Sequence, residues 1–215
     1  MAKKSKIDEP RIPDKLEQIQ FHDIFEREDP YLTNGMISNT EISGVHLEKV
    51  ELSQMVFKNV TFTDVAFHKL ELLDVIFEDC DLANADLLGA IIHRVEFKNT
   101  KLLGANLSEG NLENVTFDNC NLNLSAFSYA SMKQVKYTTS TLHSADLYDC
   151  RLKSVQFDRC ELNDINFGET SLNGIDISSS TYERLTVSIE NLAGCTVSPH
   201  QALGFASMLG LKIKE

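Results

Sequence analysis

The chain has 215 residues, 42% of them hydrophobic, which suffices for one or two domains with a sizeable core. With 20 Lys and Arg against 32 Asp and Glu, its net charge is −12, and phosphates repel a chain this acidic, which excludes direct binding to nucleic acid. The acidity suits a partner with a basic surface, or serves solubility alone.

Residues 1–31 show no regular pattern. Three early lysines are followed by no apolar stretch, so we expect no secretory signal, and no run of 18 apolar residues predicts a membrane span. We expect a cytoplasmic protein. Several apolar side chains still need burial, so we predict an N-terminal cap, either a short helix or one irregular coil: Leu16, Ile19, Phe21, Ile24 and Phe25.

A period of five residues governs the chain from Leu32 to Leu192. Every fifth residue is large and apolar at 33 consecutive positions, and the residue two before each is mostly small or apolar. Neither a helix nor a plain strand has this period. It fits a coil with four sides of five residues, whose successive turns stack as parallel strands about 4.8 Å apart.

The cysteines all fall at the small inward position: Cys80, Cys120, Cys150, Cys160 and Cys195. An odd number without paired spacing predicts buried free thiols rather than disulfides or a zinc site. The repeat-region histidines do not share one side of the coil, and no catalytic or nucleotide-binding motif is present. We therefore expect no enzyme, catalytic residue, metal or cofactor.

The C-terminal segment predicts a helix. Ser198 is a candidate N-cap, Pro199 suits the first turn, Gln201 completes a capping box, and Gly210 ends the helix. The helix is apolar around most of its circumference, so one part covers the last coil and the rest predicts a symmetric dimer. The alternative is a monomer with an apolar cap. The expected dimer residues are Leu203, Phe205, Met208, Leu209, Leu211 and Ile213.

Stretches such as Ala85–Gly89, Ala105–Glu109 and Ala145–Asp149 resemble the pentapeptide-repeat consensus Ala-(Asp/Asn)-Leu-x-x. The resemblance covers about three quarters of the chain. It implies an all-β fold, a right-handed quadrilateral parallel β-helix with a short C-terminal helical cap. The expected divisions are an N-terminal tail and cap (1–31), a β-helix of about eight coils (32–195), and a helical cap with a dimerisation segment (196–215).

A narrower resemblance involves the tail. Residues 182–186, 192–194, 197–202 and 209–211 resemble the tail of the Qnr-like pentapeptide proteins of Gram-positive bacteria. It implies a rod-shaped homodimer joined at the C-termini, whose acidic surface mimics B-form DNA. Such proteins bind DNA gyrase and topoisomerase IV and protect them from quinolones. This register carries none of the loops that Gram-negative Qnr proteins insert, so protector and inhibitor of gyrase both stay open.

The charge is unevenly distributed over the coil. We number the sides so that side 1 holds residues 30–34 and every window twenty residues later, side 2 residues 35–39, side 3 residues 40–44 and side 4 residues 45–49. Between residues 32 and 192, sides 3 and 4 each sum to −4, side 1 to −1 and side 2 to −2. We call the following set the acidic stripe and predict that it binds the partner: Asp64, Asp81, Asp86, Glu109, Asp146, Asp149, Glu161, Asp164 and Glu169.

Two functions fit these features. The first is a DNA-mimicking protein that binds gyrase or topoisomerase IV and modulates it, with quinolone protection. The second is a pentapeptide-repeat scaffold with a different protein partner. Reversing the charge of the stripe separates them, because only the first requires the stripe for gyrase binding.

Overall fold

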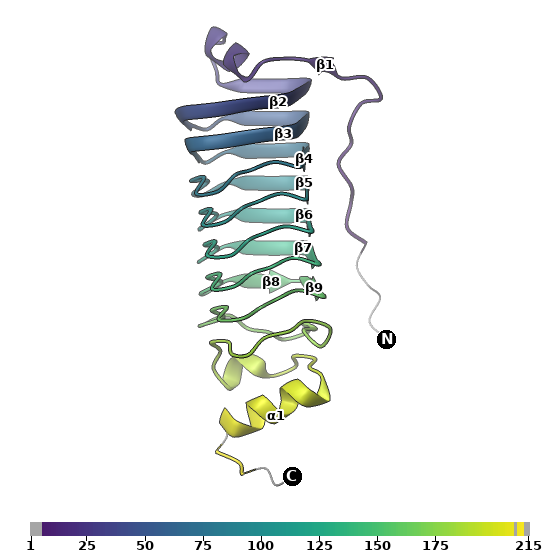
Figure 1. The fold of residues 1–215 in the computed structure, drawn as a ribbon, viewed down its shortest axis with the longest axis vertical. Coiled ribbons are helices and arrows are strands. Elements are labelled where there is room, and N and C mark those ends of the chain that lie inside the picture. The colour runs from purple at the N-terminus through teal and green to yellow at the C-terminus, as the bar shows by residue number, and fades with distance from the viewer. Residues whose placement is uncertain (1–5, 209, 213–215) are drawn as a thin grey trace.

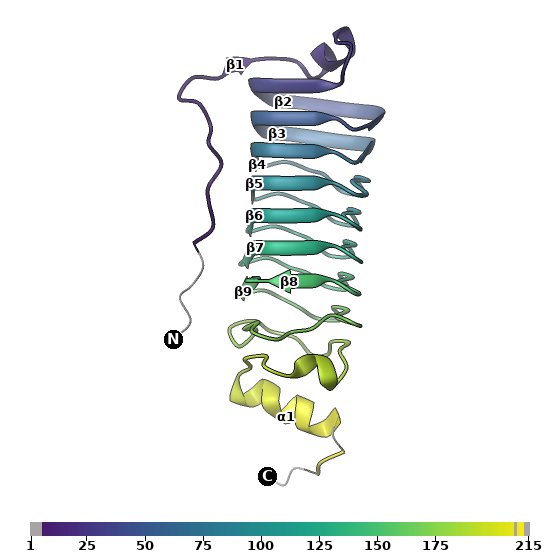
Figure 2. The ribbon, with the colours of Figure 1, turned by 180° about the vertical axis from the view of Figure 1, so that it is seen from behind.

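A computed structural model describes residues 6–208 and 210–212. The chain winds into a column of stacked coils, with a helix below the last coil and the N-terminal segment running back along one side (Figure 1). The same segment stands beside the column when the molecule is seen from behind (Figure 2).

The strands follow one another along the column in sequence order, each pairing parallel with the next. A short strand and a 3-10 helix precede the coils, and a second 3-10 helix and an α-helix follow them. The elements are β1 (Glu17–Gln18), η1 (Phe21–Glu26), β2 (Tyr31–Glu48), β3 (Glu51–His68), β4 (Glu71–Glu78), β5 (Ile91–Lys98), β6 (Asn111–Asp118), β7 (Ser131–Thr138), β8 (Arg151–Lys153), β9 (Gln156–Asp158), η2 (Glu190–Leu192) and α1 (Pro199–Met208).

The register of the strands is twenty residues. Tyr31 pairs with Glu51, and the same ladder reaches Arg151 through seven successive coils. Isolated parallel bridges with the same spacing continue to Thr196. The predicted fold class, a four-sided parallel β-helix with a C-terminal helix, is confirmed.

The sides differ in backbone structure from the fourth strand onward. Sides 1 and 2 stay extended as far as β9, whereas sides 3 and 4 fold into tight turns, as where the Ala85 N–H donates to the Leu82 carbonyl at 3.1 Å. Asn84, at the corner, has a φ of 58°. A left-handed corner suits Asn, Asp and Gly, and the small inward Ala leaves room for the sharper turn.

The core is a column of stacked rings and aliphatic side chains. All large centres of the five-residue pattern are buried except Leu47, Leu152, Tyr182 and Leu192, which pack against the core while partly exposed. On side 2, neighbouring rings are 4.9–5.1 Å apart and nearly parallel from Phe57 to Phe157. Burying rings of this size supplies the main driving force of the fold.

The N-terminal end is capped by a short helix, one of the two predicted forms. The helix η1 buries Phe21 and Ile24 over the first coil, while β1 pairs with β2. The prediction that Phe25 needs burial is wrong, because Phe25 is 50% exposed, with its ring 5.3 Å from that of His22. Residues 6–16, which we call the N-terminal strap, form no helix and run along the column instead.

The C-terminal helix begins as predicted. Ser198 and Gln201 form a reciprocal capping box, with the Ser198 N–H donating to Gln201 Oε1 at 2.8 Å and the Gln201 N–H to Ser198 Oγ at 3.2 Å. The Gln201 amide also donates to the carbonyls of Ile177 and Ser180, which fixes α1 to the last coils. After α1, Gly210 has a φ of 75°, as a helix stop requires. None of the helices in the described part of the chain could cross a bilayer.

Candidate partner-binding surfaces

The acidic stripe lies on sides 3 and 4, but its carboxylates are of two kinds. Six of them form hydrogen bonds or ion pairs with neighbouring coils, and these six are Asp64, Asp81, Asp86, Asp146, Glu161 and Asp164. A carboxylate that is already held by neighbouring side chains has fewer free oxygen lone pairs to offer a partner.

Three aspartates of the stripe support the turns that carry them. Asp81 accepts the Ala83 N–H at 2.9 Å, and Asp146 accepts the Tyr148 N–H at 3.2 Å. Asp86 accepts the Asn106 amide at 2.9 Å and lies 2.8 Å from His68 Nε2. Burial tends to raise the pKa of Asp86, but the hydrogen bonds from His68 and Asn106 and the charge of His68 hold it below its ordinary value. These side chains are part of the fold.

The other engaged members form pairs on the surface. Asp64 lies 3.3 Å from His46 Nε2 and Glu161 lies 2.9 Å from His143 Nε2, in each case a partner 18 residues earlier. Asp164 pairs with Arg184 of the following coil. Exposed pairs of this kind contribute at most about 1 kcal/mol each to stability.

Glu109, Asp149 and Glu169 are exposed, and within the described residues their side chains have neither a hydrogen bond nor an ion pair. All three occupy the last corner of side 4 in their coils, with φ between 49° and 58°. The carboxylates that are free to meet a partner therefore share one edge of the column.

The N-terminal strap follows the corner between sides 1 and 2, diagonally opposite the centre of the acidic stripe. Its main chain is held by corner side chains of successive coils. The Asp8 N–H donates to Asn114 Oδ1 at 3.0 Å, Gln54 donates to the Arg11 carbonyl at 3.3 Å, and Gln134 donates to the Lys6 carbonyl at 2.7 Å. The strap leaves the stripe uncovered.

A buried ion pair anchors the strap. Arg94 donates to both carboxylate oxygens of Asp74, at 2.6 and 2.8 Å, and the Arg11 N–H donates to Asp74 at 2.9 Å. Burial tends to raise the pKa of Asp74, but the hydrogen bonds from Arg94 and the Arg11 N–H, with the charges of both arginines, keep it below its ordinary value.

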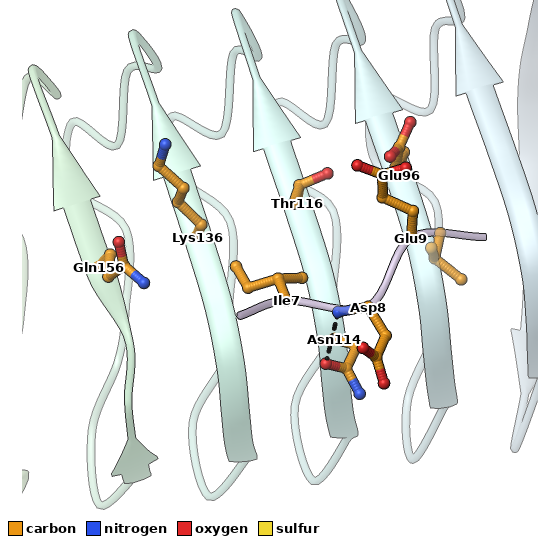
Figure 3. A pocket seen from close by; sticks show the side chains of 9 residues that line it. Ile7, Asp8, Glu9, Glu96, Asn114, Thr116, Lys136 and Gln156 are labelled. Atoms are coloured by element: carbon orange, nitrogen blue, oxygen red, sulfur yellow. Dashed lines mark hydrogen bonds between the residues drawn. The ribbon is translucent and has the colours of Figure 1, made fainter. Parts of the chain in front are cut away.

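A hollow of about 270 Å³ lies between the strap and side 2 (Figure 3). Ile7 of the strap lies beside Thr116 and Lys136, and Asp8 lies beside Asn114. Lys136 lies 3.8 Å from Asp158, and Glu96 pairs with Lys98. With Lys136 and Glu96 already paired, the remaining charged side chains of the lining are those of Asp8 and Glu9, so the hollow does not suit an anionic ligand.

The C-terminal end exposes part of the predicted dimer surface. Leu203, Met208 and Leu211 are 50%, 46% and 59% exposed, whereas Phe205 is half-buried against Tyr182, at 6.0 Å between ring centroids. Phe205 thus belongs in part to the cap. Leu209 and Ile213 lie outside the described residues.

The cysteines are free, as predicted, and Cys195 alone is half-buried while the other four are buried. Burial raises the pKa of Cys120 and Cys150 to about 12 and that of Cys80, Cys160 and Cys195 to about 11. Such thiols are poor nucleophiles at neutral pH. Within residues 6–208 and 210–212, no three His, Cys, Asp or Glu side chains gather as metal ligands.

Exposed apolar residues in the middle coils of the acidic sides were missed by the sequence reasoning. Leu124, Tyr129 and Tyr148 are 63%, 58% and 37% exposed, and we call them the tyrosine patch. The signal was present in the sequence, because Leu124 and Tyr129 fall at the last corner of a five-residue unit, where polar residues and glycine prevail.

Comparison with known proteins identifies relatives of this chain. The family model described as "Pentapeptide repeat region" matches residues 90–167. The "Uncharacterized protein YisX" of Bacillus subtilis (strain 168) is 42% identical over 207 residues, covering 96% of this chain and 97% of that protein.

Two solved structures are similar at low identity. A trypsin-treated form of QnrB1, "a plasmid-mediated fluoroquinolone resistance protein", has a TM-score of 0.49 at 14% identity, over 84% of this chain and 100% of that chain. HetL, "involved in Heterocyst Differentiation Regulation" in the cyanobacterium Nostoc sp. Strain PCC 7120, has a TM-score of 0.41 at 17% identity, over 82% and 88%.

The relative of 42% identity, the matching family model and the five-residue register converge on one classification. The chain belongs to the pentapeptide-repeat family.

Proposed function

We propose that this protein is a non-enzymatic, cytoplasmic DNA mimic that binds DNA gyrase, with topoisomerase IV as a second target, and modulates the enzyme, giving quinolone protection. The observation that carries the proposal is the acidic stripe, which follows two adjacent sides of a rigid column and stays uncovered by the strap. A protein surface that holds DNA is basic, and acidic side chains in a row complement it.

The proposed assembly is a homodimer through the C-terminal end. The exposed side chains of Leu203, Met208 and Leu211 support a second copy as the occupant of this surface. A two-fold contact there would place two columns end to end and double the length of the stripe. The resemblance of the tail to Qnr-like proteins favours the same arrangement.

The test is charge reversal at the carboxylates that the fold does not use. The variant Glu109→Lys, Asp149→Lys, Glu169→Lys should weaken gyrase binding at least about tenfold and flatten its salt dependence, because lost complementary charge slows association. Surface plasmon resonance with purified gyrase at two salt concentrations measures both effects.

The matched control is Glu51→Lys, Glu71→Lys, Asp118→Lys, which makes the same change of net charge at exposed positions on sides 1 and 2. It should bind gyrase nearly as the unaltered protein does. Equal binding by the two triple variants would contradict the proposal and favour a scaffold with a different protein partner.

A further inference from the structure

The tyrosine patch interrupts the acidic stripe with exposed apolar surface. Leu124 ends side 3 and Tyr129 ends side 4 of one coil, and Tyr148 lies on side 4 of the next. The rings of Tyr129 and Tyr148 are edge to face, with centroids 5.8 Å apart and an interplanar angle of 80°. Exposed apolar side chains that cluster in this way commonly mark a contact surface.

The fold makes room for the patch. At Gly168, in the coil after Tyr148, an added Cβ would come within 2.9 Å of Tyr148 Cδ2, so the glycine lets the ring lie flat on the column. Leu124 and Tyr129 have φ of 61° and 64°, a conformation that costs a residue with a side chain about 1–2 kcal/mol. The fold imposes this conformation at every corner from Asn34 to Gly174, but it does not require an apolar side chain there, and neither Leu124 nor Tyr129 is buried.

Unengaged carboxylates border the same tyrosines. Glu109, Tyr129, Asp149 and Glu169 occupy one corner in four successive coils, at about 4.8 Å per coil. Each carboxylate there lacks an ion pair among the described residues, in contrast to the six engaged members of the stripe.

Asp149 and Glu169 share a surface hollow with basic residues. Lys133, Arg151 and Lys153 of side 1 belong to its lining, and Lys133 is paired with Glu113. None of the three forms an ion pair with Asp149 or Glu169 within the described residues. The carboxylates of Asp149 and Glu169 are therefore not neutralised by these basic residues, and they stay available to a cation that lies on the tyrosine rings of side 4.

We propose that Tyr129, Tyr148, Asp149 and Glu169 form a receptor for an arginine side chain of the protein partner, with Leu124 contacting an apolar neighbour of that arginine. A guanidinium stacks on an aromatic face and pairs with carboxylates through its planar fork. A lysine ammonium stacks less well and cannot form the same two-pronged pair. The negative charge of Asp149 and Glu169 and the apolar rings of the two tyrosines complement an arginine, which is cationic and has a flat face that stacks on rings. The inference rests on the proposed function for the identity of the partner, not for the chemistry of the receptor.

The first experiment measures gyrase binding by the full-length double variant Tyr129→Ser, Tyr148→Ser. Affinity should fall about 30-fold or more, the loss typical of a hot spot, with the salt dependence unchanged because no charge is removed. The control is Tyr31→Ser, which removes an exposed tyrosine from side 1. Gly168→Ala keeps both tyrosines but displaces the ring of Tyr148, and should weaken binding to a smaller extent.

The second experiment is independent of gyrase. Two synthetic peptides, identical except for arginine or lysine at every basic position, are titrated into the protein while the ring resonances of Tyr129 and Tyr148 are followed by NMR. The arginine peptide should shift both rings and bind several-fold more tightly, and this preference should disappear in Asp149→Asn, Glu169→Gln.

The outcomes separate the two proposals. Unchanged gyrase binding by the tyrosine variant, with loss of binding on charge reversal, would overturn the receptor and leave the DNA mimic standing. If the unaltered protein does not bind gyrase, the proposed function fails, and the peptide titration then tests the arginine receptor by itself. Equal shifts by the two peptides, or none, would then overturn the receptor as well.

Discussion

At the scale of single residues, position within the five-residue unit determines what each side chain does. The large centre fills the core, the small residue two places earlier lets the chain turn, and the last residue adopts a left-handed corner. Phe97 illustrates the first role, since it is fully buried and stacks at 4.9 Å on both Phe77 and Phe117.

Replacing Phe97 by Asp should prevent folding. The change removes a ring whose loss alone costs about 3–5 kcal/mol and buries a carboxylate without a partner. The expected outcome is an insoluble or unfolded protein, scored by soluble yield and far-UV circular dichroism. Phe97→Leu, which keeps an apolar side chain, is the control and should stay folded. A soluble Asp variant with an unaltered spectrum would show that the core register is wrong.

Asp74 is a residue whose charge the fold needs. Because its pKa is lowered in the folded state, its contribution to stability is complete above its ordinary pKa of about 3.9 and is lost as the pH falls through the lowered value. We expect hydrogen-exchange protection of the Arg11 amide to decrease with acid in this range. In Asp74→Asn, which cannot ionise, the same amide should show no such titration.

Removing one partner of the Asp74–Arg94 ion pair should lower the stability of the protein. Asp74→Ala leaves the half-buried guanidinium of Arg94 without its partner, and should lower the free energy of unfolding by about 2–3 kcal/mol. Asp79→Ala is the control, because Asp79 has nearly the same φ, 55° against 58°, but is exposed. Similar losses for both variants in urea unfolding would assign the effect to the corner backbone and not to the ion pair.

At the scale of elements, regular and irregular parts differ in how far the sequence could predict them. The coils follow from a local period, and α1 follows from the capping box of Ser198 and Gln201, which the structure shows. The path of the strap could not be predicted, because its hydrogen bonds join residues 43 to 128 positions apart. Phe25 was misplaced because hydrophobicity alone does not say which face of η1 meets the coil.

The acidic stripe also could be predicted from the sequence only in part. Its sides follow from counting in windows of twenty, but the sequence alone did not separate engaged from free carboxylates. The pairs of Asp64, Asp86 and Glu161 with histidines 18 residues earlier obey the coil period, so a search at spacings of 18 and 20 could have found them. The role of Tyr148 depended on Gly168, a contact visible only in the folded coil.

The exposed apolar residues of the C-terminal end test the dimer. Met208→Glu with Leu211→Glu should convert a dimer into a monomer of 24.1 kDa, because charges on both copies would face each other in an apolar contact. Light scattering after size exclusion measures the mass. His200→Glu, an exposed change on the first turn of α1, is the control and should leave the dimer intact. A monomer for the unaltered protein would contradict the proposed assembly.

At the scale of the whole molecule, distinct features occupy different parts of the column. The strap follows the corner between sides 1 and 2, the acidic stripe with its tyrosine patch follows sides 3 and 4, and α1 closes the C-terminal end. A partner can therefore dock on the stripe without displacing the strap. The column presents its free carboxylates at the spacing of the coils, so its rigidity fixes the pattern that the partner meets.

The most direct measurement is a gyrase supercoiling assay in which the full-length protein is titrated with and without a quinolone. A DNA mimic with protective action should restore supercoiling in the presence of the drug, and the variant Glu109→Lys, Asp149→Lys, Glu169→Lys should fail to do so. Inhibition without restoration would make the protein a competitor for the DNA-binding surface and would contradict the protective role. No effect of the protein at tens of micromolar, with or without the drug, would contradict the proposed action on gyrase altogether.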